Sequence, residues 1–389
     1  MSKHTTQIAI IGGGICGLWL LNILRQKGYD AWLFEKDSLG GVQTLASQGM
    51  IHGGLKYALG GFTTPSSESI AQMPEVWRSC LAGSGPIDLS GLDVLSDDYY
   101  LFSDNALSSK VTAFFASKSL QGRISVLDRA DYPGVFQAEK FKGKLYRLED
   151  LVLDTPQLVK KLSDKYQGYI FQGAPEVLTD GSAITGLDFP GTNQTIVADR
   201  YILTAGAGNE ALISGLPRQT ISMQQRPLQQ VMVRGDLPKL YAHAVSLASA
   251  NKPRVTFTSH AVNDNKTVWY LGGNLAEQGV GVPADKLIDM ARKELNLLLP
   301  WIDLEDTQWA TLNIDRAEPA QAMKNKPDFP FVKSVANYTV CWPTKLTLTP
   351  MLGDEVLQQL PIQPNNSQSA LPQLPPPLQA RTPWEIAFD

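Results

Sequence analysis

The chain of 389 residues contains no apolar run of the ~18 residues that a membrane-spanning helix needs. Charged residues make up 19% of the chain, and the net charge of -4 provides no basic excess for nucleic-acid binding. The first residues, MSKHTTQ, lead directly into an apolar run, so we expect no signal peptide. The composition therefore favours a cytoplasmic protein that has no transmembrane segment and no nucleic-acid partner.

Cysteine and histidine are also scarce. The three cysteines, Cys16, Cys80 and Cys341, are far apart and form no C-x-x-C pair. This excludes a disulfide framework and a cysteine-based metal site, and it suits a reducing compartment. We expect no bound metal. The chain is nevertheless long enough for two domains or one elaborated domain, and its hydrophobic content of 43% supplies a sizeable core.

The stretch formed by residues 8–35 follows the order strand, glycine turn, helix, strand and acid. This order predicts a βαβ dinucleotide site. Gly12 allows the tight turn, Gly14 lets the backbone approach a pyrophosphate, and Gly17 lets the helix pack closely on the strand. Glu35 follows Gly17 by 18 residues, where a carboxylate at a strand end accepts hydrogen bonds from ribose hydroxyls.

A glycine-rich turn without a ligand is the simpler interpretation of this motif, but the complete strand–helix–strand context favours a real site. The N–H groups of the first helical turn, which includes Ile15 and Cys16, would face the phosphates. Cys16 occupies a variable position of the motif, where a small residue is needed. Glu35 disfavours a 2′-phosphate because the two anions would repel each other. The motif alone does not separate NAD from FAD.

The next two dozen residues are small, polar and rich in glycine, where a nicotinamide-binding domain would continue with a helix and a strand. Such a segment suits backbone that lies against a large, flat ligand. We assign to the cofactor site six residues of this region: Lys36, Gln43, Thr44, Ser47, Gly49 and Met50.

Residues 47–57 read SQGMIHGGLKY, and together with the glycine motif and Glu35 they resemble the D-amino-acid-oxidase superfamily of FAD-dependent oxidoreductases. The phrase IHGGLKY is similar to one in flavin-linked glycerol-3-phosphate and 2-hydroxy-acid dehydrogenases. The resemblance extends from residue 7 to about residue 357. It implies FAD as the cofactor and an α/β fold, with a Rossmann-like FAD-binding domain and an inserted antiparallel β-sheet that forms the substrate domain.

Two later segments match the superfamily less closely. The predicted strand 195–203 ends in a small-residue turn at Ala205 and Gly206, and a similar turn passes close to FAD in relatives. An ordinary strand-to-helix turn would explain the same glycines. Residues 338–357 resemble the return of the chain to the flavin, where the last helix points its N-terminus at the pyrimidine ring. The usual version is rich in glycine, whereas this chain has Lys345, Leu346 and Thr347, and Lys345 could supply positive charge there.

The resemblance and the local patterns suggest three parts of the chain. We assign residues 1–75, 146–222 and 325–360 to a discontinuous FAD-binding domain, and residues 76–145 and 223–324 to the substrate domain. Helices are expected at 68–81, 107–120, 157–166 and 285–299, and a hairpin at 254–271. Residues 361–389 are rich in Pro, Gln, Asn and Ser, so we expect an extended or disordered tail, with Trp384, Ile386 and Phe388 available for docking.

Four residues are candidates for catalysis. His52 could be a structural residue near the cofactor, a general base, or a covalent anchor for FAD as in some relatives. Arg316 could bind a substrate carboxylate, as an arginine of the same sheet does in relatives, or pair with Asp315 or Glu318. His260 and Tyr270 could line the substrate pocket, but a strand-edge histidine and a core aromatic are the simpler interpretations. His243, Lys56 and Tyr57 are weaker candidates.

We therefore expect an FAD-dependent oxidoreductase that oxidises a CH–OH or CH–NH bond of a small anionic substrate by hydride transfer to flavin N5. The phrase IHGGLKY favours a hydroxy acid or a polyol phosphate over an amine. The electron acceptor could be oxygen, a quinone or a carrier protein. Three alternatives stay open: an amino-acid or amine oxidase of the same fold, an accessory flavoprotein with structural FAD and a partner-binding tail, and an NAD dehydrogenase.

Overall fold

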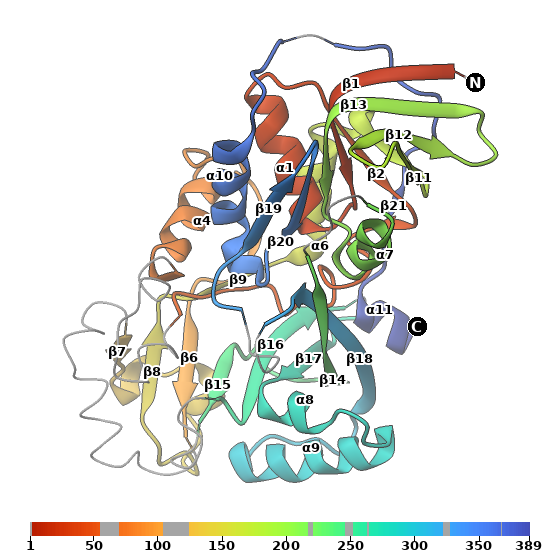
Figure 1. The fold of residues 1–389 in the computed structure, drawn as a ribbon. Helices are drawn as coiled ribbons and strands as arrows, with labels where there is room; N and C mark the ends of the chain where they lie inside the picture. Colours follow the sequence, from red (N-terminus) through yellow and green to blue (C-terminus); the bar gives the residue numbers. More distant parts are fainter. Residues whose placement is uncertain are drawn as a thin grey trace.

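The computed structural model of the chain describes residues 2–54, 70–103, 124–216, 221–245, 252–262, 264–321, 327–366 and 368–389. Two large β-sheets organise these residues, one in the upper half of Figure 1 and one in the lower half. The two predicted motif strands belong to the upper sheet, whereas the strand that carries Arg316 belongs to the lower sheet.

The upper sheet has eight strands within the described residues, in the order β10-β2-β1-β13-β12-β11, with β20 beside β13 and β19 beside β20. Five of these strands, β10, β2, β1, β13 and β20, run parallel, so their carboxyl ends meet at one edge, which is where open α/β sheets bind ligands. The strands are β1 (Ser2–Ile11), β2 (Ala31–Glu35), β10 (Ile170–Gln172), β11 (Glu176–Thr179), β12 (Ile184–Phe189), β13 (Gln194–Leu203), β19 (Phe331–Val335) and β20 (Tyr338–Trp342).

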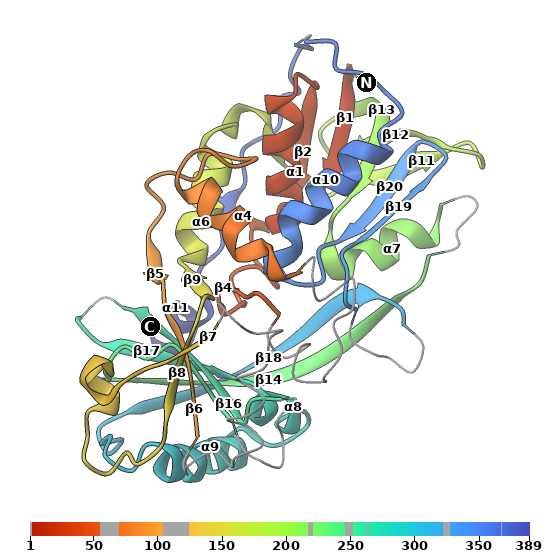
Figure 2. The ribbon, with the colours of Figure 1, turned by 90° about the vertical axis from the view of Figure 1, so that its left-hand side faces the viewer.

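Within the described residues, four helices cover one face of the upper sheet, which Figure 2 turns toward the viewer. They are α1 (Ile15–Gln26), α4 (Met73–Leu81), α6 (Thr155–Asp164) and α10 (Thr349–Gln359). Helix α1 is central and is buried along nearly its whole length, and its Trp19 packs against Trp77 of α4 with ring centroids 5.1 Å apart. The short helix α7 (Asn209–Ser214) packs with the opposite face, so the sheet is covered on both sides.

The lower sheet also has eight strands within the described residues, in the order β18-β14-β17-β16-β15-β6-β8-β7. All neighbours are antiparallel except β15 and β6, so the predicted antiparallel sheet contains one parallel pair. The strands are β6 (Tyr99–Phe102), β7 (Ile124–Val126), β8 (Leu145–Leu148), β14 (Met223–Gly235), β15 (Ala242–Ala244), β16 (Val255–Ala261), β17 (Thr267–Gly272) and β18 (Gln308–Pro319).

Helices α8 (Asn274–Gln278) and α9 (Ala284–Leu298) lie below the lower sheet in Figure 1. Helix α9 buries Leu287, Ala291, Leu295 and Leu298, which recur at helical spacing and join the core of this sheet. The remaining short elements are β3 (Ser38–Leu39), β4 (Met50–Ile51), β5 (Val94–Ser96), β9 (Leu151–Leu153) and the 3₁₀ turns Arg129–Asp131, Gly134–Phe136, Gln167–Tyr169, Gly206–Gly208 and Leu346–Leu348.

Several local predictions are confirmed by the described elements. Helix α6 begins after Asp154, whose carboxylate accepts from the Gln157 N–H at 3.0 Å, as its N-cap sequence indicates. Strands β16 and β17 form the expected hairpin, with Asp264 and Asn265 at positive φ in the turn. The helix expected at 107–120 lies outside the described residues, and so do Lys56 and Tyr57. The domain boundaries stay a prediction, although β8 crosses the one placed at residue 146 and pairs in the lower sheet.

Of the two states expected for the C-terminal segment, extended or disordered, the described residues have the extended one and end in a short helix. It leaves α10, crosses the top of the upper sheet in Figure 1 and descends to β21 (Leu378–Gln379) and α11 (Pro383–Phe388). The chain is held by backbone and side-chain groups of the body: Asn366 N–H donates to Gly28 O, Gln172 N–H donates to Pro375 O, and Ala380 N–H donates to Leu39 O. These hydrogen bonds order a segment that has too few apolar residues to be ordered by burial alone.

The end of this segment docks on the lower sheet. Helix α11 begins at a capping box, in which the Thr382 hydroxyl accepts from the Glu385 N–H and the Glu385 carboxylate accepts from the Thr382 N–H. Trp384 is 5% exposed, and its ring stacks on His260 of β16 with centroids 3.9 Å apart. The predicted docking of Trp384 is therefore intramolecular, whereas Ile386 is 66% exposed.

Candidate functional site

The glycine turn between β1 and α1 is shaped by close backbone contacts. Gly12 has φ +115°, and a Cβ there would lie 2.6 Å from the Ala205 Cα. A Cβ at Gly17 would overlap the Gly12 carbonyl oxygen, which itself accepts from the Thr204 hydroxyl at 2.9 Å. Glycine at these two positions is therefore required by the protein itself, because the turn, the helix and the 204–206 segment touch at this point.

Gly14 differs from these two glycines. A Cβ at Gly14 would meet only the Thr44 hydroxyl oxygen, at 3.3 Å, so its side of the turn is open to a ligand. Gly14 is the N-cap of α1 without a side-chain cap, and the first turn carries no acidic residue. Thr44 Oγ1 accepts from the Ile15 N–H at 3.0 Å, which places the second cofactor segment against the helix N-terminus. The Ile15 N–H is therefore taken by Thr44, whereas no acidic side chain of the first turn competes with an anion for the positive end of α1.

Glu35 ends strand β2 beside this turn. Its carboxylate accepts from the Gly13 N–H at 2.6 Å and from the Asp37 N–H at 2.9 Å. The acid that the motif predicted is therefore in contact with the glycine turn, where a ribose next to the pyrophosphate would lie. Lys36 points into solvent and pairs with Asp37, with both side chains more than half exposed.

The turn at 204–206 brings a third cofactor segment to the same place. Gly206 has φ +58°, and a Cβ there would lie 3.5 Å from the Gln43 side-chain oxygen. The same Gln43 oxygen accepts from the Ala317 N–H of β18 at 3.1 Å. Because β18 is the edge strand of the lower sheet, its free N–H meets Gln43 across the junction of the two sheets. Gln43 thereby connects the predicted cofactor turn to the strand of Arg316.

The segment 345–347 contacts the loop that follows β4. The Thr347 hydroxyl donates to the His52 carbonyl oxygen at 3.2 Å, and the Thr347 carbonyl accepts from Trp77 Nε1 at 3.1 Å. Leu346 begins the 3₁₀ turn before α10. Lys345 Nζ donates to the Pro327 carbonyl oxygen at 3.0 Å. His52 is half-buried here, next to Gly53, whose N–H donates to Asp150.

Three predicted cofactor residues, Ser47, Gly49 and Met50, lie at the start of β4 or in the loop before it. The Ser47 hydroxyl donates to the Thr44 carbonyl at 2.8 Å, and Gly49 has φ +70°, with its Cβ position filled by the Leu153 carbonyl oxygen. Met50 starts β4 and pairs with Val152 of β9. Next to them, Gln48 Nε2 donates to the Tyr270 carbonyl at 2.8 Å and so joins this loop to the lower sheet.

These residues fit FAD. The chain combines a helix N-terminus whose N-cap residue has no side chain, an open face at Gly14, an acid at the strand end and small-residue segments on both sides. A pyrophosphate needs the first two features, and a ribose needs the third. Ala205 and Gly206 are held by Asn209, whose side-chain oxygen accepts from the Ala205 N–H, and by Trp342, whose ring N–H donates to the Gly206 carbonyl.

Arg316 is the candidate substrate-binding residue with the clearest geometry. Its Nη2 is buried and has no hydrogen-bond partner among the described residues, while its Nε donates weakly to the Arg226 carbonyl at 3.4 Å. Two effects lower the pKa of Arg316 to about 10: burial, which is the larger, and the positive charge of the nearby Arg226 guanidinium. The side chain is still positively charged at neutral pH. A buried cation with a free donor calls for an anionic partner.

The carboxylate that could have neutralised Arg316 is occupied. Glu318 is 2% exposed and accepts from Arg226 Nε at 2.6 Å and Arg226 Nη2 at 3.2 Å. From the sequence we considered an ion pair between Arg316 and Glu318. In the structure it is Arg226 that pairs with Glu318. Arg226 and Gln224 were missed by that reasoning, because their positions opposite Arg316 and Glu318 depend on the pairing of β14 with β18.

His260 and Tyr270 are placed together, but both are enclosed. Burial lowers the pKa of His260 to about 3, so the imidazole is neutral, and it lies between Trp384 and the Thr258 hydroxyl. Burial also raises the pKa of Tyr270 well above its usual value of 10.0, and its hydroxyl lies 2.6 Å from the Gln230 side-chain oxygen and 2.9 Å from the Ala46 carbonyl. These contacts favour structural roles for both residues.

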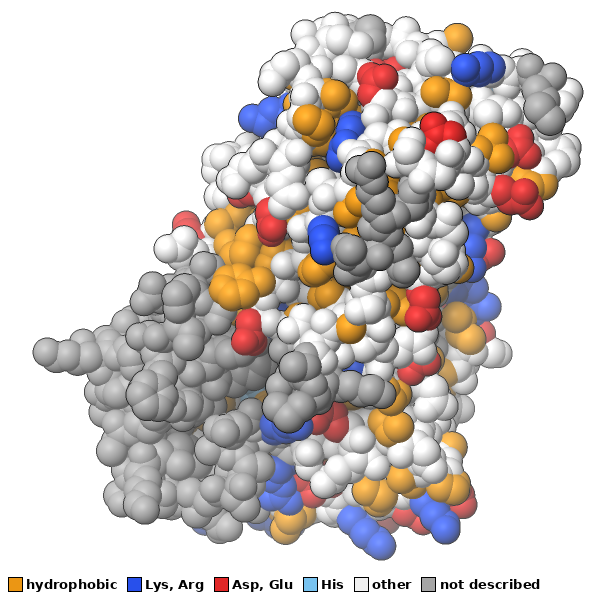
Figure 3. Space-filling view, in the orientation of Figure 1, with side chains coloured by type: hydrophobic (Ala, Val, Ile, Leu, Met, Phe, Trp, Pro, Cys, Tyr) orange, Lys and Arg blue, Asp and Glu red, His pale blue; other side chains and the backbone are white. Residues whose placement is uncertain are grey.

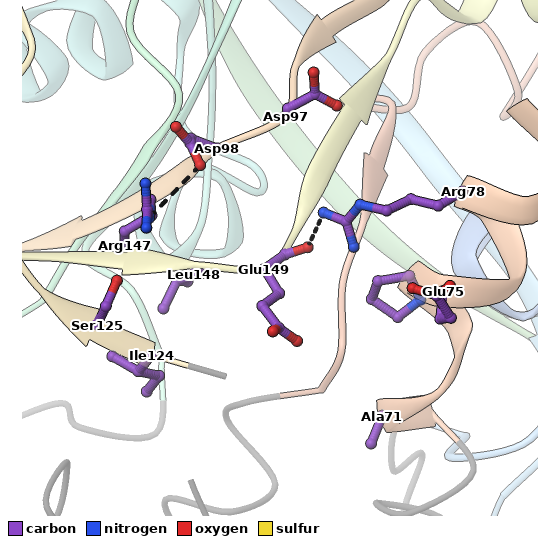
Figure 4. Close-up of a pocket in the computed structure, with 11 residues that line it drawn as sticks. Ala71, Glu75, Arg78, Asp97, Asp98, Ile124, Ser125, Arg147, Leu148 and Glu149 are labelled. Carbon is purple, nitrogen blue, oxygen red and sulfur yellow. Dashed lines mark hydrogen bonds and ion pairs between the residues drawn. The ribbon is translucent and has the colours of Figure 1, made fainter. Parts of the chain in front are cut away.

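A cavity of about 490 Å³ lies elsewhere, between α4 and strands β6, β7 and β8 (Figure 4). Arg78 of α4 donates to the Glu149 carbonyl at 2.7 Å, and Arg147 pairs with Asp98 at 3.8 Å. The described residues that line this cavity include none of the predicted site residues. Because its charges are of mixed sign and partly exposed, we do not assign the chemistry to it.

The surface and the helices add two observations. On the described part of the face in Figure 3, blue and red side chains are interspersed and no basic area dominates. Within the described residues, no helix is long and apolar enough to span a membrane, and no three His, Cys, Asp or Glu side chains are grouped as a metal site requires.

Comparisons with known proteins agree with this geometry. A family model described as FAD dependent oxidoreductase matches residues 7–332. The chain is 46% identical to the probable FAD-dependent oxidoreductase PA4991 of Pseudomonas aeruginosa, over 99% of this chain and 98% of that protein. The crystal structure of that protein superposes with a TM-score of 0.86 and 42% identity, covering both chains completely.

More distant solved structures share the fold. Iminodiacetate oxidase from Chelativorans sp. BNC1 has a TM-score of 0.64 and 17% identity, over 96% of this chain and 100% of that one. L-α-glycerophosphate oxidase from Mycoplasma pneumoniae, with FAD bound, has a TM-score of 0.65 and 14% identity, over 96% of this chain and 100% of that one. At these identities the likeness concerns the fold alone.

Proposed function

The chain belongs to the DAO family of FAD-dependent oxidoreductases, and on this premise we propose that it oxidises a CH–OH or CH–NH bond of a small anionic substrate whose charged group is bound by Arg316. FAD, when bound, accepts the hydride at N5 and passes the electrons to an acceptor. The expected superfamily, FAD cofactor, enzyme class and mixed α/β fold are confirmed, and the NAD alternative is excluded.

The single observation that carries the substrate proposal is the Arg316 guanidinium. Its Nη2 is buried without a partner among the described residues, and the neighbouring carboxylate is already bound by Arg226. Burying a charged donor without a partner costs free energy, and a substrate carboxylate or phosphate would remove that cost through charge-assisted hydrogen bonds. An arginine whose Nη2 has no partner among the described residues, on a strand that also contacts the predicted cofactor turn, is therefore suited to orient an anionic substrate.

The remaining predicted residues would hold FAD and the substrate in fixed positions relative to each other. The N-terminus of α1 and Gly14 would bind the pyrophosphate, and Glu35 would accept from the ribose hydroxyls. Gln43 would keep Ala317, and with it Arg316, at a fixed position relative to the 204–206 turn. The N-terminus of α10, with Lys345 nearby, would stabilise negative charge on the flavin pyrimidine ring.

His52 keeps its three interpretations within this proposal. Two histidines are candidates for catalysis. His52 belongs to a predicted cofactor segment, whereas His260 lies on β16 and is covered by Trp384. A base near neutral pH would take the proton from the substrate hydroxyl or amine. Flavin that stays with the protein after acid precipitation would instead identify His52 as a covalent anchor, and released flavin would exclude that role.

The fold alone does not decide which substrate bond, CH–OH or CH–NH, is oxidised. Two proteins that share the fold are named an iminodiacetate oxidase and an L-α-glycerophosphate oxidase. Their names refer to an amine and to an alcohol, so the fold is compatible with either bond. The phrase IHGGLKY at 51–57 favours a hydroxy acid or a polyol phosphate, and we retain that preference. An amino-acid oxidase is the second candidate, because an arginine-bound carboxylate is common to both substrate classes.

An anaerobic flavin-bleaching screen tests the proposal. The holoenzyme is mixed with 2-hydroxy acids, glycerol phosphate and amino acids, and the loss of visible flavin absorbance is followed. We expect at least one anionic member to bleach the flavin and its neutral amide or alcohol analogue to fail. The accessory-flavoprotein alternative would be supported if dithionite reduced the flavin but every member of the screen failed to do so.

Replacing Arg316 tests the binding role directly. Arg316→Met should lower kcat/KM for the active substrate about 100-fold, because hydrogen bonds to a charged group are worth ~3 kcal/mol. Arg147→Met is the matched control, since Arg147 is half-exposed in the separate cavity and should leave kcat/KM unchanged. Equal activity of the Arg316→Met variant and wild type would remove Arg316 from the proposal.

A further inference from the structure

Four polar residues form a block on one face of the paired strands β14 and β18. Arg226 lies directly opposite Arg316, and Gln224 lies directly opposite Glu318. Residues two apart in a strand point to the same face, so all four side chains share that face. We call this set the anion block: Gln224, Arg226, Arg316 and Glu318.

Glu318 is held firmly within the anion block. Both of its oxygens accept from Arg226, and one of them also accepts from Gln224 Nε2 at 2.9 Å. The Gln224 amide is oriented in turn, because its oxygen accepts from the Gln321 N–H at 3.0 Å. Three donors therefore fix the carboxylate on the Arg226 side of the block.

The two arginines are not equivalent as a result. Arg226 has a bidentate partner, whereas Arg316 has a donor nitrogen without one among the described residues. Like charges directly opposite each other in a sheet are destabilising, so a second anion is needed to balance the pair. Glu277 also acts on Arg316 from a greater distance, but it pairs with Lys252 at 2.6 Å.

We propose that the Arg226–Glu318 ion pair is a specificity device: it sets the net charge of the anion block to +1 and leaves one guanidinium, Arg316, for a monocarboxylate rather than a phosphate dianion. This inference rests on the proposed function and narrows its substrate class. Arg226, Gln224 and Glu318 are positioning residues here, because they act on the substrate through Arg316.

The net charge of the anion block explains why a monocarboxylate is favoured over a phosphate dianion. Two guanidinium groups and one carboxylate leave a single positive charge, which one substrate carboxylate neutralises. A dianion in the same block would leave one buried negative charge without a partner, and such a charge costs more than its contacts return. The substrate class is then a hydroxy or amino monocarboxylate, and polyol phosphates are disfavoured.

Three variants separate charge from shape. Glu318→Gln keeps the side-chain length and raises the block to +2. Arg226→Met lowers it to zero and frees Glu318 to pair with Arg316. The double variant Arg226→Met, Glu318→Gln returns the block to +1 and is the matched control for both. Each holoenzyme is titrated with acetate and with inorganic phosphate at pH 8, and binding is read from the flavin difference spectrum and from the shift in Tm.

Wild type is expected to bind acetate more tightly than phosphate. Glu318→Gln should improve phosphate binding about tenfold relative to acetate, and Arg226→Met should weaken acetate binding about tenfold. The double variant should recover acetate binding to within about threefold of wild type, because Arg316 is again free and singly charged. Recovery by a second substitution is not expected from general damage to the fold.

Two failures can be told apart. If Arg316→Met abolishes acetate binding while Glu318→Gln and Arg226→Met leave the acetate-to-phosphate affinity ratio at its wild-type value, the proposed function survives and this inference is overturned. If acetate binds Arg316→Met as tightly as wild type, or has no effect on wild type, both the proposed function and this inference are wrong.

Discussion

At the scale of single residues, His260 shows how burial determines protonation. The imidazole is 4% exposed and stacks on Trp384, and burial lowers its pKa from 6.5 to about 3. In the unfolded chain the same group binds a proton below pH 6.5. The unfolded state therefore holds more protons than the folded state between about pH 3 and 6.5, so the stability of the folded protein decreases as the pH falls through this window.

His260→Phe should remove this pH dependence while keeping a flat ring against Trp384. Between pH 7 and pH 5, the free energy of unfolding of wild type should fall relative to that of the variant by about 2 kcal/mol, since one pKa unit corresponds to ~1.4 kcal/mol. Urea unfolding at the two pH values measures the difference. Parallel decreases in wild type and variant would contradict a neutral, buried His260.

At the scale of elements, the β1–α1 turn separates two uses of glycine. Gly17 is needed for packing, because a Cβ there would overlap the Gly12 carbonyl oxygen. Gly14 has no such packing requirement, because the nearest described atom to its Cβ position is the Thr44 hydroxyl oxygen at 3.3 Å, and we therefore propose that glycine is needed there for the ligand. The GxGxxG pattern alone does not distinguish these two requirements, whereas the contacts around each glycine do.

Alanine at the two positions should therefore have different effects. Gly14→Ala should fold with a Tm close to that of the wild-type apoprotein but lose FAD affinity by at least about tenfold, because the methyl group occupies the approach to the pyrophosphate. Gly17→Ala should lower the free energy of unfolding of the apoprotein by ~2 kcal/mol or more. Differential scanning fluorimetry of the apoproteins and FAD titration measure both; unimpaired FAD binding by Gly14→Ala would remove the cofactor from this position.

At the scale of the whole molecule, the C-terminal segment (residues 361–366 and 368–389), which we call the strap, contacts both sheets. It hydrogen-bonds to the upper sheet at Gln172 and Gln194 and then places Trp384 on the lower sheet, against Tyr270 and His260. Tyr270 in turn contacts Ala46 in the cofactor loop. The strap is thus expected to stabilise the relative position of the two halves of the site.

Trp384→Ala should lower the free energy of unfolding by ~3 kcal/mol, the usual cost of removing a buried tryptophan side chain. Ile386→Ala is the control from the same short helix, because Ile386 is 66% exposed and its removal should change stability by less than about 0.5 kcal/mol. Chemical denaturation of the holoenzymes gives both values. Equal stability of the two variants would mean that α11 contributes little to the fold.

Much of the architecture could be predicted from local sequence. The βαβ unit, the acid at the end of β2, the Asp154 cap and the β16–β17 hairpin all depend on residues that are near one another in the chain. The T-P-W-E sequence at 382–385 is a capping box, and it could have indicated α11 as well. Low apolar content made residues 361–389 look disordered because hydrogen bonds to a distant body are not visible in composition.

The sequence by itself determined the cofactor half of this protein: the glycine turn, the strand-end acid and the small-residue loop specify a flavin site through short-range geometry, and the family comparison agrees. Only the tertiary structure decided the substrate half. Arg226 and Glu318 are separated by 92 residues, and the register of β14 against β18 determines that they pair. Among the described residues, Arg316 Nη2 is then left without a hydrogen-bond partner. A shift of that register by one residue would turn these side chains to the other face, so the charge of the anion block is a property of the folded sheet.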